Sequence, residues 1–207
     1  MGMKLYGLTG GVGMGKSTAA DWLRNQGASV VDTDLLAREI VAPGQPALEE
    51  IQRAFGPKFI DATGDLRRAE LARLVFTDAI ALRLLEGILH PRIRQQWKLQ
   101  AELWRDAGKP MAVVVIPLLF ETQAAPDYDT TVCVACSPAT QELRLLARGW
   151  SLDEIQRRIA AQMPIEKKIA LSDRIIWNEG PLPVLYAQLR RVFSIREQTI
   201  NPTATKG

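Results

Sequence analysis

The sequence predicts an α/β fold built around a mostly parallel sheet. Short apolar runs alternate along the chain with longer segments of helical periodicity, which is typical of strands joined by crossover helices. The run Val113–Ile116 is entirely β-branched, as expected for a strand that is covered on both faces. At 207 residues, the chain is long enough for one core domain with small insertions.

Turn and cap signals divide the first half of the sheet region. We expect a helix over Ser17–Gln26 that ends near Gly27, and a second from Thr33 or Asp34 to Val41 that Pro43-Gly44 breaks. The candidate strands are Leu5–Leu8, Ser29–Val31, Met111–Ile116, Thr131–Ala135 and Arg174–Trp177.

Residues 45–108 show helical periodicity and no strong strand. Apolar residues recur there at spacings of three and four, from Leu48, Ile51 and Phe55 onward. Trp97 and Trp104 are expected to pack in the interior. The segment is too large for a simple crossover, so we interpret it as an inserted helical subdomain.

A helical pair follows the fourth strand and is called the arm (137–162). Ser137-Pro138 supplies an N-cap and a proline at N1, Gly149 ends the first helix, and Ser151 opens a capping box for the second. Arg144 and Arg148 are four residues apart, which predicts that both lie on one helical face. Guanidinium groups bind phosphate oxygens, so a hinged arm can close over a phosphate ligand; a solvated helix face is the alternative.

Residues 10–17 match the phosphate-loop pattern G-x-x-x-x-G-K-[ST] between a predicted strand and a predicted helix. The glycines allow the backbone to curl and to direct its N–H groups inward, while the helix N-terminus adds its positive dipole end. Lys16 then reaches the outer phosphates, and the Ser17 hydroxyl is a ligand for Mg²⁺. A flexible glycine loop with a surface lysine does not explain these fixed offsets.

Asp32-Thr33-Asp34 follows the second strand, so its carboxylates reach the same end of the sheet as the phosphate loop. Phosphoryl transfer to an alcohol needs a group that accepts the hydroxyl proton, and we expect Asp34 to do so. Asp32 is expected to assist Mg²⁺ binding or to share that role. The alternative is that Asp32 only caps the next helix and Asp34 only occupies its first turn.

Composition excludes several classes of protein. An apolar fraction of 47% and a charged fraction of 24% are ordinary for a soluble globular protein, and a net charge of +3 is too small to indicate nucleic-acid binding. The longest apolar run, 111–120, contains Pro117 and is too short to span a bilayer. The N-terminus lacks a signal-peptide pattern, so we expect a cytoplasmic protein.

Cys133 and Cys136 form a C-x-x-C within a predicted strand. Side chains three apart on a strand point to opposite faces, and no second cysteine pair exists to complete a zinc site. We therefore expect buried structural thiols. His90, before Pro91, is the single histidine, and its spacing alone favours a structural role.

Several segments, in order, resemble the dephospho-coenzyme A kinase family. Beyond Leu8–Thr18, they include Asp32–Arg38, His90-Pro91, Pro117–Glu121, Arg144 with Arg148, Arg158–Gln162 and Ser172–Asn178. The match runs from about residue 4 to about residue 193. Met14 stands where the family often has serine and should point away from phosphate, and Trp177 stands where an aspartate is expected.

This resemblance implies ATP-dependent phosphorylation of the ribose 3′-hydroxyl of dephospho-coenzyme A, the last step of coenzyme A biosynthesis. It implies a P-loop kinase core with a five-stranded parallel sheet, a helical subdomain for the coenzyme A substrate, and a mobile lid. By resemblance Asp34 is the base, Arg148 contacts ATP phosphates, Asn178 neighbours the adenine, and Arg38 and His90 lie on the acceptor side. The full set of expected nucleotide contacts is Gly11, Gly13, Met14, Gly15, Lys16, Ser17, Thr18, Arg144, Arg148 and Asn178.

The expected organisation is one domain over residues 1–195. Its core comprises 1–44, 109–136 and 163–195, its substrate insertion 45–108 and its lid 137–162, followed by a polar tail over 196–207. Expected ligands are ATP, Mg²⁺ and dephospho-coenzyme A, with no nucleic-acid or membrane partner; the oligomeric state stays open. Two alternatives are another small-molecule kinase, resembling shikimate kinase, and a non-enzymatic nucleotide-binding switch.

Overall fold

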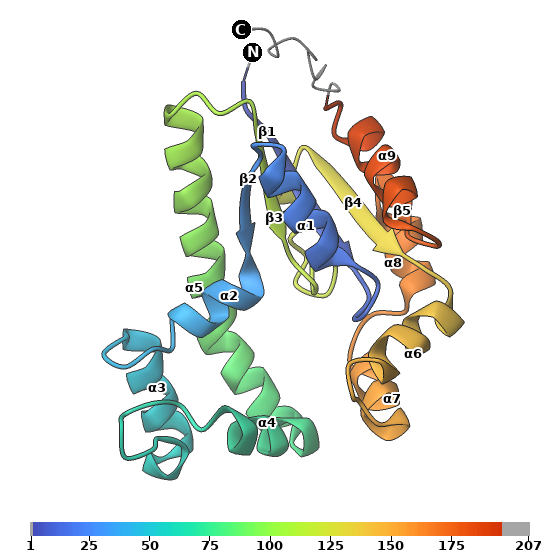
Figure 1. The fold of residues 1–207 in the computed structure, drawn as a ribbon. Helices are drawn as coiled ribbons and strands as arrows, with labels where there is room; N and C mark the ends of the chain where they lie inside the picture. The colour runs from blue at the N-terminus through green and yellow to red at the C-terminus, as the bar shows by residue number, and fades with distance from the viewer. Residues whose placement is uncertain (1, 196–207) are drawn as a thin grey trace, which may run out of the picture.

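A computed structural model describes residues 2–195, and the expected polar tail, 196–207, lies outside the described residues. Its centre is a five-stranded parallel sheet in the order β2-β3-β1-β4-β5, which confirms the predicted α/β fold (Figure 1). The strands are β1 Lys4–Gly10, β2 Ser29–Asp32, β3 Met111–Val115, β4 Thr130–Ala135 and β5 Arg174–Trp177. Each lies within two residues of its predicted bounds.

Helices connect and cover the strands. They are α1 Lys16–Asn25, α2 Thr33–Glu39, α3 Pro46–Phe55, α4 Arg68–Thr77, α5 Ala79–Asp106, α6 Pro138–Leu146, α7 Leu152–Ala160, α8 Ile165–Leu171 and α9 Leu182–Val192, with short 3₁₀ turns at Pro57–Phe59 and Ala125–Asp127. Ser137 and Ser151 cap α6 and α7 as predicted, each accepting a backbone N–H three residues later. After Leu146 the helix tightens into a turn that ends at Gly149, as expected: Gly149 has a φ of 81°, its N–H donates to the Leu146 carbonyl, and the Trp150 N–H donates to the Leu145 carbonyl.

The sheet is buried on both faces, and its side chains alternate between two apolar clusters. Val113 and Val115 pack in the cluster beneath α1 and α9, whereas Ala112 and Val114 pack in the cluster beneath α5. The uninterrupted apolar run in β3 thus has the two-sided burial that its sequence predicted.

The segment between β2 and β3 is helical, as its periodicity predicted, and it has an apolar cluster of its own. Ile51, Leu71 and Ile88 from α3, α4 and α5 meet there. Figure 1 shows α3 and α4 at the end of α5 that lies away from the sheet. The other end of α5 packs on the sheet through Trp97 and Ala101, so a single helix joins the two clusters.

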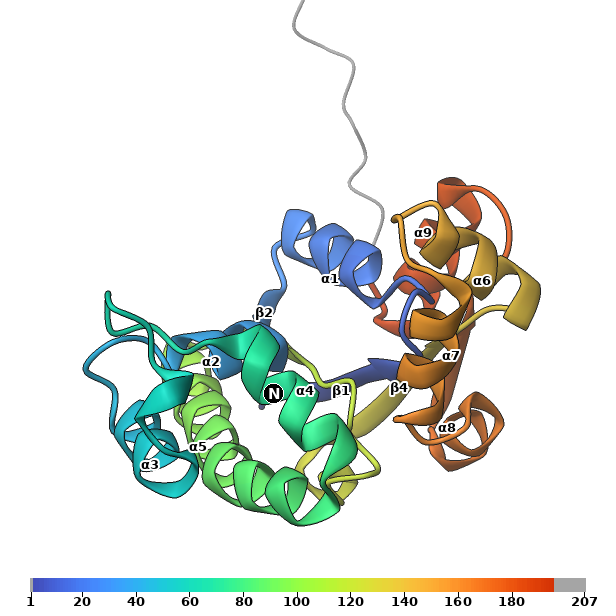
Figure 2. The same ribbon diagram turned by 90° about the horizontal axis from the view of Figure 1, so that it is seen from below.

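The helices α3 and α4 lie on one side of the carboxyl end of the sheet, and α6 and α7 lie on the other (Figure 2). Within residues 2–195, no helix is both long and apolar enough to cross a membrane.

Both cysteines are buried and free, as expected. The expected separation onto opposite faces is wrong, since Cys133 and Cys136 belong to one cluster with Met14. The reason is that β4 ends at Ala135, so Cys136 no longer follows the alternation of the strand.

We predict that the packing of α5 on the sheet depends on Trp97. Its side chain is 2% exposed and stacks on Tyr128, with ring centroids 5.2 Å apart. Trp97→Ala should lower the free energy of unfolding by about 3–5 kcal/mol, as for other large-to-small changes in a core. Leu99→Ala, at an exposed position of the same helix, should change it by less than about 0.5 kcal/mol. Urea unfolding measures both, and equal effects of the two changes would contradict the assignment.

Candidate active site

The phosphate loop (10–17) joins the carboxyl end of β1 to the start of α1 and depends on glycines at two crowded positions. Gly10 and Gly15 have φ values of 144° and 105°. A Cβ on Gly10 would lie 2.1 Å from the Val134 carbonyl oxygen, and one on Gly15 would lie 2.1 Å from Nδ2 of Asn178. Both positions therefore require glycine on steric as well as conformational grounds.

Side-chain amides hold the backbone of this loop in place. Gln141 donates through Nε2 to the Val12 carbonyl at 2.7 Å, and Gln162 accepts the Val12 N–H through Oε1 at 3.1 Å. Asn178 donates through Nδ2 to the Met14 carbonyl at 2.9 Å. The loop is thus fixed by both ends of the arm and by the segment after β5.

The start of α1 leaves its amide donors for a ligand. Its N-cap residue is Gly15, no side chain caps the helix, and its first turn holds no acidic residue. Ser17 is exposed and Thr18 is half-buried in that first turn. Uncapped N–H groups and the positive end of the helix dipole favour an anion at this point.

Lys16 lies folded against the loop. Its Nζ donates to the carbonyl oxygens of Gly10 at 2.8 Å and Gly11 at 2.9 Å. Burial, reinforced by the positive charge of Lys168, lowers the pKa of Lys16 to about 8. Negative charge arriving at the loop will favour the ammonium form.

Met14 is 1% exposed and packs with Cys133, Ile165 and Ile169. Its side chain therefore points into the interior, as expected. Trp177, the other noted departure, is 46% exposed, and its backbone N–H and carbonyl are bonded to the side chain of Gln188 on α9.

The two aspartates after β2 have different surroundings. Asp32 accepts the Asp34 N–H through Oδ1 at 2.9 Å and so caps α2. Asp34 lies in the first turn of α2, where partial burial and the charge of Asp32 raise the pKa of its carboxyl group. Lys16 and Arg38 oppose that shift through their positive charge, which places both cations near Asp34.

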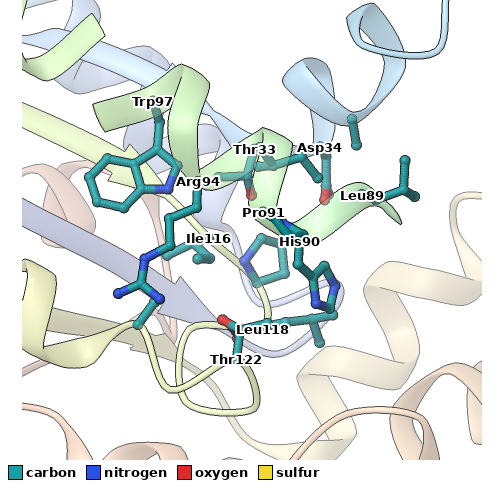
Figure 3. Close-up of a pocket in the computed structure, with 14 residues that line it drawn as sticks. Thr33, Asp34, Leu89, His90, Pro91, Arg94, Trp97, Ile116, Leu118 and Thr122 are labelled. Atoms are coloured by element: carbon teal, nitrogen blue, oxygen red, sulfur yellow. Dashed lines mark hydrogen bonds between the residues drawn. The ribbon is translucent and has the colours of Figure 1, made fainter. Parts of the chain in front are cut away.

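A cavity of about 460 Å³ opens beside Asp34 and is called the Asp34 cavity. Figure 3 shows Asp34 and His90 at its border, with Trp97 and Arg94 from the same helix as His90. Its wall is mostly apolar and comes from α2, α5 and the segment after β3. The lining residues are Thr33, Asp34, Ala37, Leu89, His90, Pro91, Ile93, Arg94, Trp97, Ile116, Pro117, Leu118, Thr122 and Ala124.

The two arginines of the arm are placed differently. Arg144 on α6 is half-buried and donates through Nη2 to the Asn178 carbonyl at 3.1 Å, while its Nη1 is buried without a partner in the described part of the chain. Arg148 is exposed and lies in the turn that continues α6, so the shared face of the two arginines stays a prediction. The structure therefore brings Arg144, but not Arg148, against a residue that holds the phosphate loop.

No group of three or more metal-ligating side chains occurs among residues 2–195. A Mg²⁺ ion that binds with a nucleotide does not need one, because it keeps several waters and takes one or two protein oxygens besides the phosphates. The Ser17 hydroxyl and the Asp32 carboxylate are oxygen donors of the kind that this ion prefers. The donor set fits Mg²⁺ delivered with a triphosphate.

Sequence reasoning missed several residues of this region. Gln141 had no signal, because one polar residue in a helix with exposed faces is unremarkable. Arg94 pairs with Asp127 at 2.6 Å, a contact between distant segments that no local pattern marks. Lys168 was missed although a signal exists, because helical spacing places it, and not Lys167, on the same face as Ile165 and Ile169.

Known proteins resemble this chain over most of its length. The family model for dephospho-CoA kinase matches residues 4–183. A dephospho-CoA kinase from Bdellovibrio bacteriovorus is 40% identical over 199 residues, covering 96% of this chain and 99% of its own, and one from Aromatoleum aromaticum is 44% identical over 190 residues, covering 91% of each. The crystal structure of TT1252 from Thermus thermophilus superposes with a TM-score of 0.82 at 34% identity, covering 94% of this chain and 98% of that one. The chain belongs to the dephospho-CoA kinase family.

Proposed function

We propose that this protein transfers the γ-phosphoryl group of ATP to the ribose 3′-hydroxyl of dephospho-coenzyme A, giving coenzyme A and ADP in the last step of coenzyme A biosynthesis. Membership of the family supports the reaction. The observation that carries it is the placement of Asp34 in the wall of a cavity and near enough to Lys16 of the phosphate loop for their charges to interact.

On the nucleotide side, the N–H groups of the phosphate loop and of the first turn of α1 bind the triphosphate oxygens. Gly11, Gly13, Met14, Gly15 and Thr18 contribute through the backbone at this turn. Lys16 leaves the Gly10 and Gly11 carbonyls and places its ammonium on the outer phosphates.

On the acceptor side, Asp34 accepts the proton of the attacking hydroxyl and orients its oxygen in line with the phosphorus. Its raised pKa brings its basicity closer to what proton transfer near neutral pH requires. Arg38, beside Asp34, and His90, on the wall of the Asp34 cavity, contact the acceptor.

Ser17 and Asp32 would hold Mg²⁺ with the nucleotide. When bound, this ion neutralises charge on the β- and γ-phosphate oxygens. Because Oδ1 of Asp32 also caps α2, the same residue fixes the position of Asp34 along the helix start.

The remaining assignments follow from the arrangement of the elements. The insertion (45–108) forms the acceptor side, and the arm (137–162) forms a lid that brings Arg144 and Arg148 to the phosphates and excludes water. Asn178 lies beside the adenine. The reaction needs neither nucleic acid nor a membrane, which accords with a cytoplasmic enzyme.

A shikimate-type kinase and a nucleotide-dependent switch are not favoured, because the relatives at about 40% identity are dephospho-CoA kinases over nearly their whole length. An assay separates the three functions. The pure protein with Mg·ATP should form ADP rapidly with dephospho-coenzyme A, and only at background rates with shikimate or without an acceptor. Coenzyme A is a matched control, because its 3′-hydroxyl is already phosphorylated. No ADP above background with dephospho-coenzyme A would refute the proposal.

We predict that Asp34→Asn lowers kcat by about 10²–10⁴-fold, because the amide keeps the shape of the carboxylate but does not accept a proton. Affinity for dephospho-coenzyme A, measured by calorimetry, should change far less. Asp21→Asn removes an exposed carboxylate that pairs with Arg24 and should leave kcat unchanged. If kcat of Asp34→Asn were within about twofold of the parent value, Asp34 would not be the base.

We predict an alkaline limit on the use of ATP. The ammonium form of Lys16 binds phosphate, and its lowered pKa means that this form is present below pH about 8 and lost above it. At saturating acceptor, kcat/KM for ATP should therefore fall about tenfold per pH unit above that value. In Lys16→Arg the cation persists, so whatever activity remains should not show this decline. A profile for the parent that stays flat to pH 10 would contradict the role of Lys16.

A further inference from the structure

Lys168 on α8 is the one charged residue in the buried set of residues 2–195, with a relative exposure of 0%. Its Nζ donates to the Pro117 carbonyl at 2.5 Å and forms an ion pair with Oε1 of Glu121 at 2.8 Å. A buried ammonium is costly unless it is paired and hydrogen-bonded, and both partners here come from the single segment that follows β3.

The same two acceptors serve other parts of the site. The Pro117 carbonyl also accepts the Thr9 hydroxyl at 3.2 Å, and Thr9 directly precedes the phosphate loop. Oε1 of Glu121 also accepts the Met163 N–H at 2.8 Å, next to the Gln162 side chain that holds Val12. Lys168 therefore lies where the end of β1, the segment 117–121 and the return of the arm meet.

This junction bears on the acceptor because Pro117 and Leu118 belong to the wall of the Asp34 cavity. The other oxygen of Glu121, Oε2, is buried without a partner in the described part of the chain, so the carboxylate is held through Oε1 alone. Removing the Lys168 ammonium takes away one of the two partners of Oε1 and leaves the Met163 N–H. The Pro117 carbonyl in the cavity wall then keeps, within the described residues, only the 3.2 Å hydrogen bond from the Thr9 hydroxyl.

We propose that Lys168 is a positioning residue for phosphoryl transfer: it fixes the segment 117–121 between the phosphate loop and the arm, and thereby sets the distance between the acceptor and the nucleotide. This inference rests on the proposed function. It assigns Lys168 no contact with either substrate.

Stability alone does not account for a lysine at this place. Replacing a buried ion pair with apolar side chains is often neutral or stabilising, so an apolar residue would serve a purely structural role as well. Lys168 also stands near enough to Lys16 to lower its pKa, which is an unfavourable placement of like charges. By contrast, the lysine ammonium has three N–H donors on a flexible side chain, so it can bind the Pro117 carbonyl and the Glu121 carboxylate at the same time.

The test compares Lys168→Met with Lys167→Met, which makes the same change at the exposed neighbouring position of α8. Because a misplacement of about 1 Å can cost about a hundredfold in rate, kcat/KM for dephospho-coenzyme A should fall by about that factor in Lys168→Met. The dissociation constant for ATP should change by less than about threefold. Lys167→Met should match the parent, and Lys168→Arg should recover part of the loss.

Two results would overturn the inference. One is a kcat/KM for the acceptor in Lys168→Met equal to that of Lys167→Met. The other is a loss that affects ATP binding and acceptor use alike and follows the melting temperature, which would mark a structural role. If Lys168→Met does not fold, Glu121→Gln decides, since it keeps an acceptor for Met163 but weakens the ion pair and should impair use of the acceptor selectively. If the parent protein showed no turnover, the proposed function itself would be refuted. If the parent turned over normally and Lys168→Met had the same kcat/KM as Lys167→Met, only this inference would be refuted.

Discussion

The site depends first on the two hydrogen bonds that hold Val12. A loop that exposes its amides to a phosphate has few backbone partners of its own, so its shape must be imposed from outside. Gln141 donates to the Val12 carbonyl and Gln162 accepts the Val12 N–H. Asn178 donates to the Met14 carbonyl. Since Gln141 and Gln162 lie at opposite ends of the arm, the shape of the loop and the position of the arm are linked by the same contacts.

The acceptor side depends on a different element, the 28-residue helix α5. At 1.5 Å per residue it extends for roughly 42 Å. Ile88 belongs to the core of the insertion, His90 to the wall of the Asp34 cavity, and Ala101 to the core of the sheet. The insertion is therefore attached to the sheet through one continuous helix. The packing of the far end of α5 on the sheet positions the part of the cavity wall that this helix contributes.

Much of this arrangement follows from local sequence patterns. The glycines, Lys16 and Ser17 have fixed offsets, and a continuous run such as Val113–Ile116 has few alternatives to a buried strand. Features that arise from tertiary contacts could not be predicted from local sequence patterns. The pairing of Lys168 with Glu121 joins two segments that are distant in the sequence, and nothing in the spacing of Arg144 and Arg148 shows that Arg144 donates to the Asn178 carbonyl. Pro91 lies inside α5, where its sequence position suggests an interruption, because packing on both sides outweighs the lost hydrogen bond.

The burial of the two cysteines matters for the proposed reaction because the proposed substrate is itself a thiol. Thiol–disulfide exchange requires an accessible thiolate, and Cys133 and Cys136 are 0% and 1% exposed, with the pKa of both thiols raised by burial. They share a cluster with Met14, so a mixed disulfide formed there would displace the nucleotide-binding turn. Burial thus keeps both cysteine sulfur atoms of this protein from exchanging with the thiol group of the proposed substrate and product.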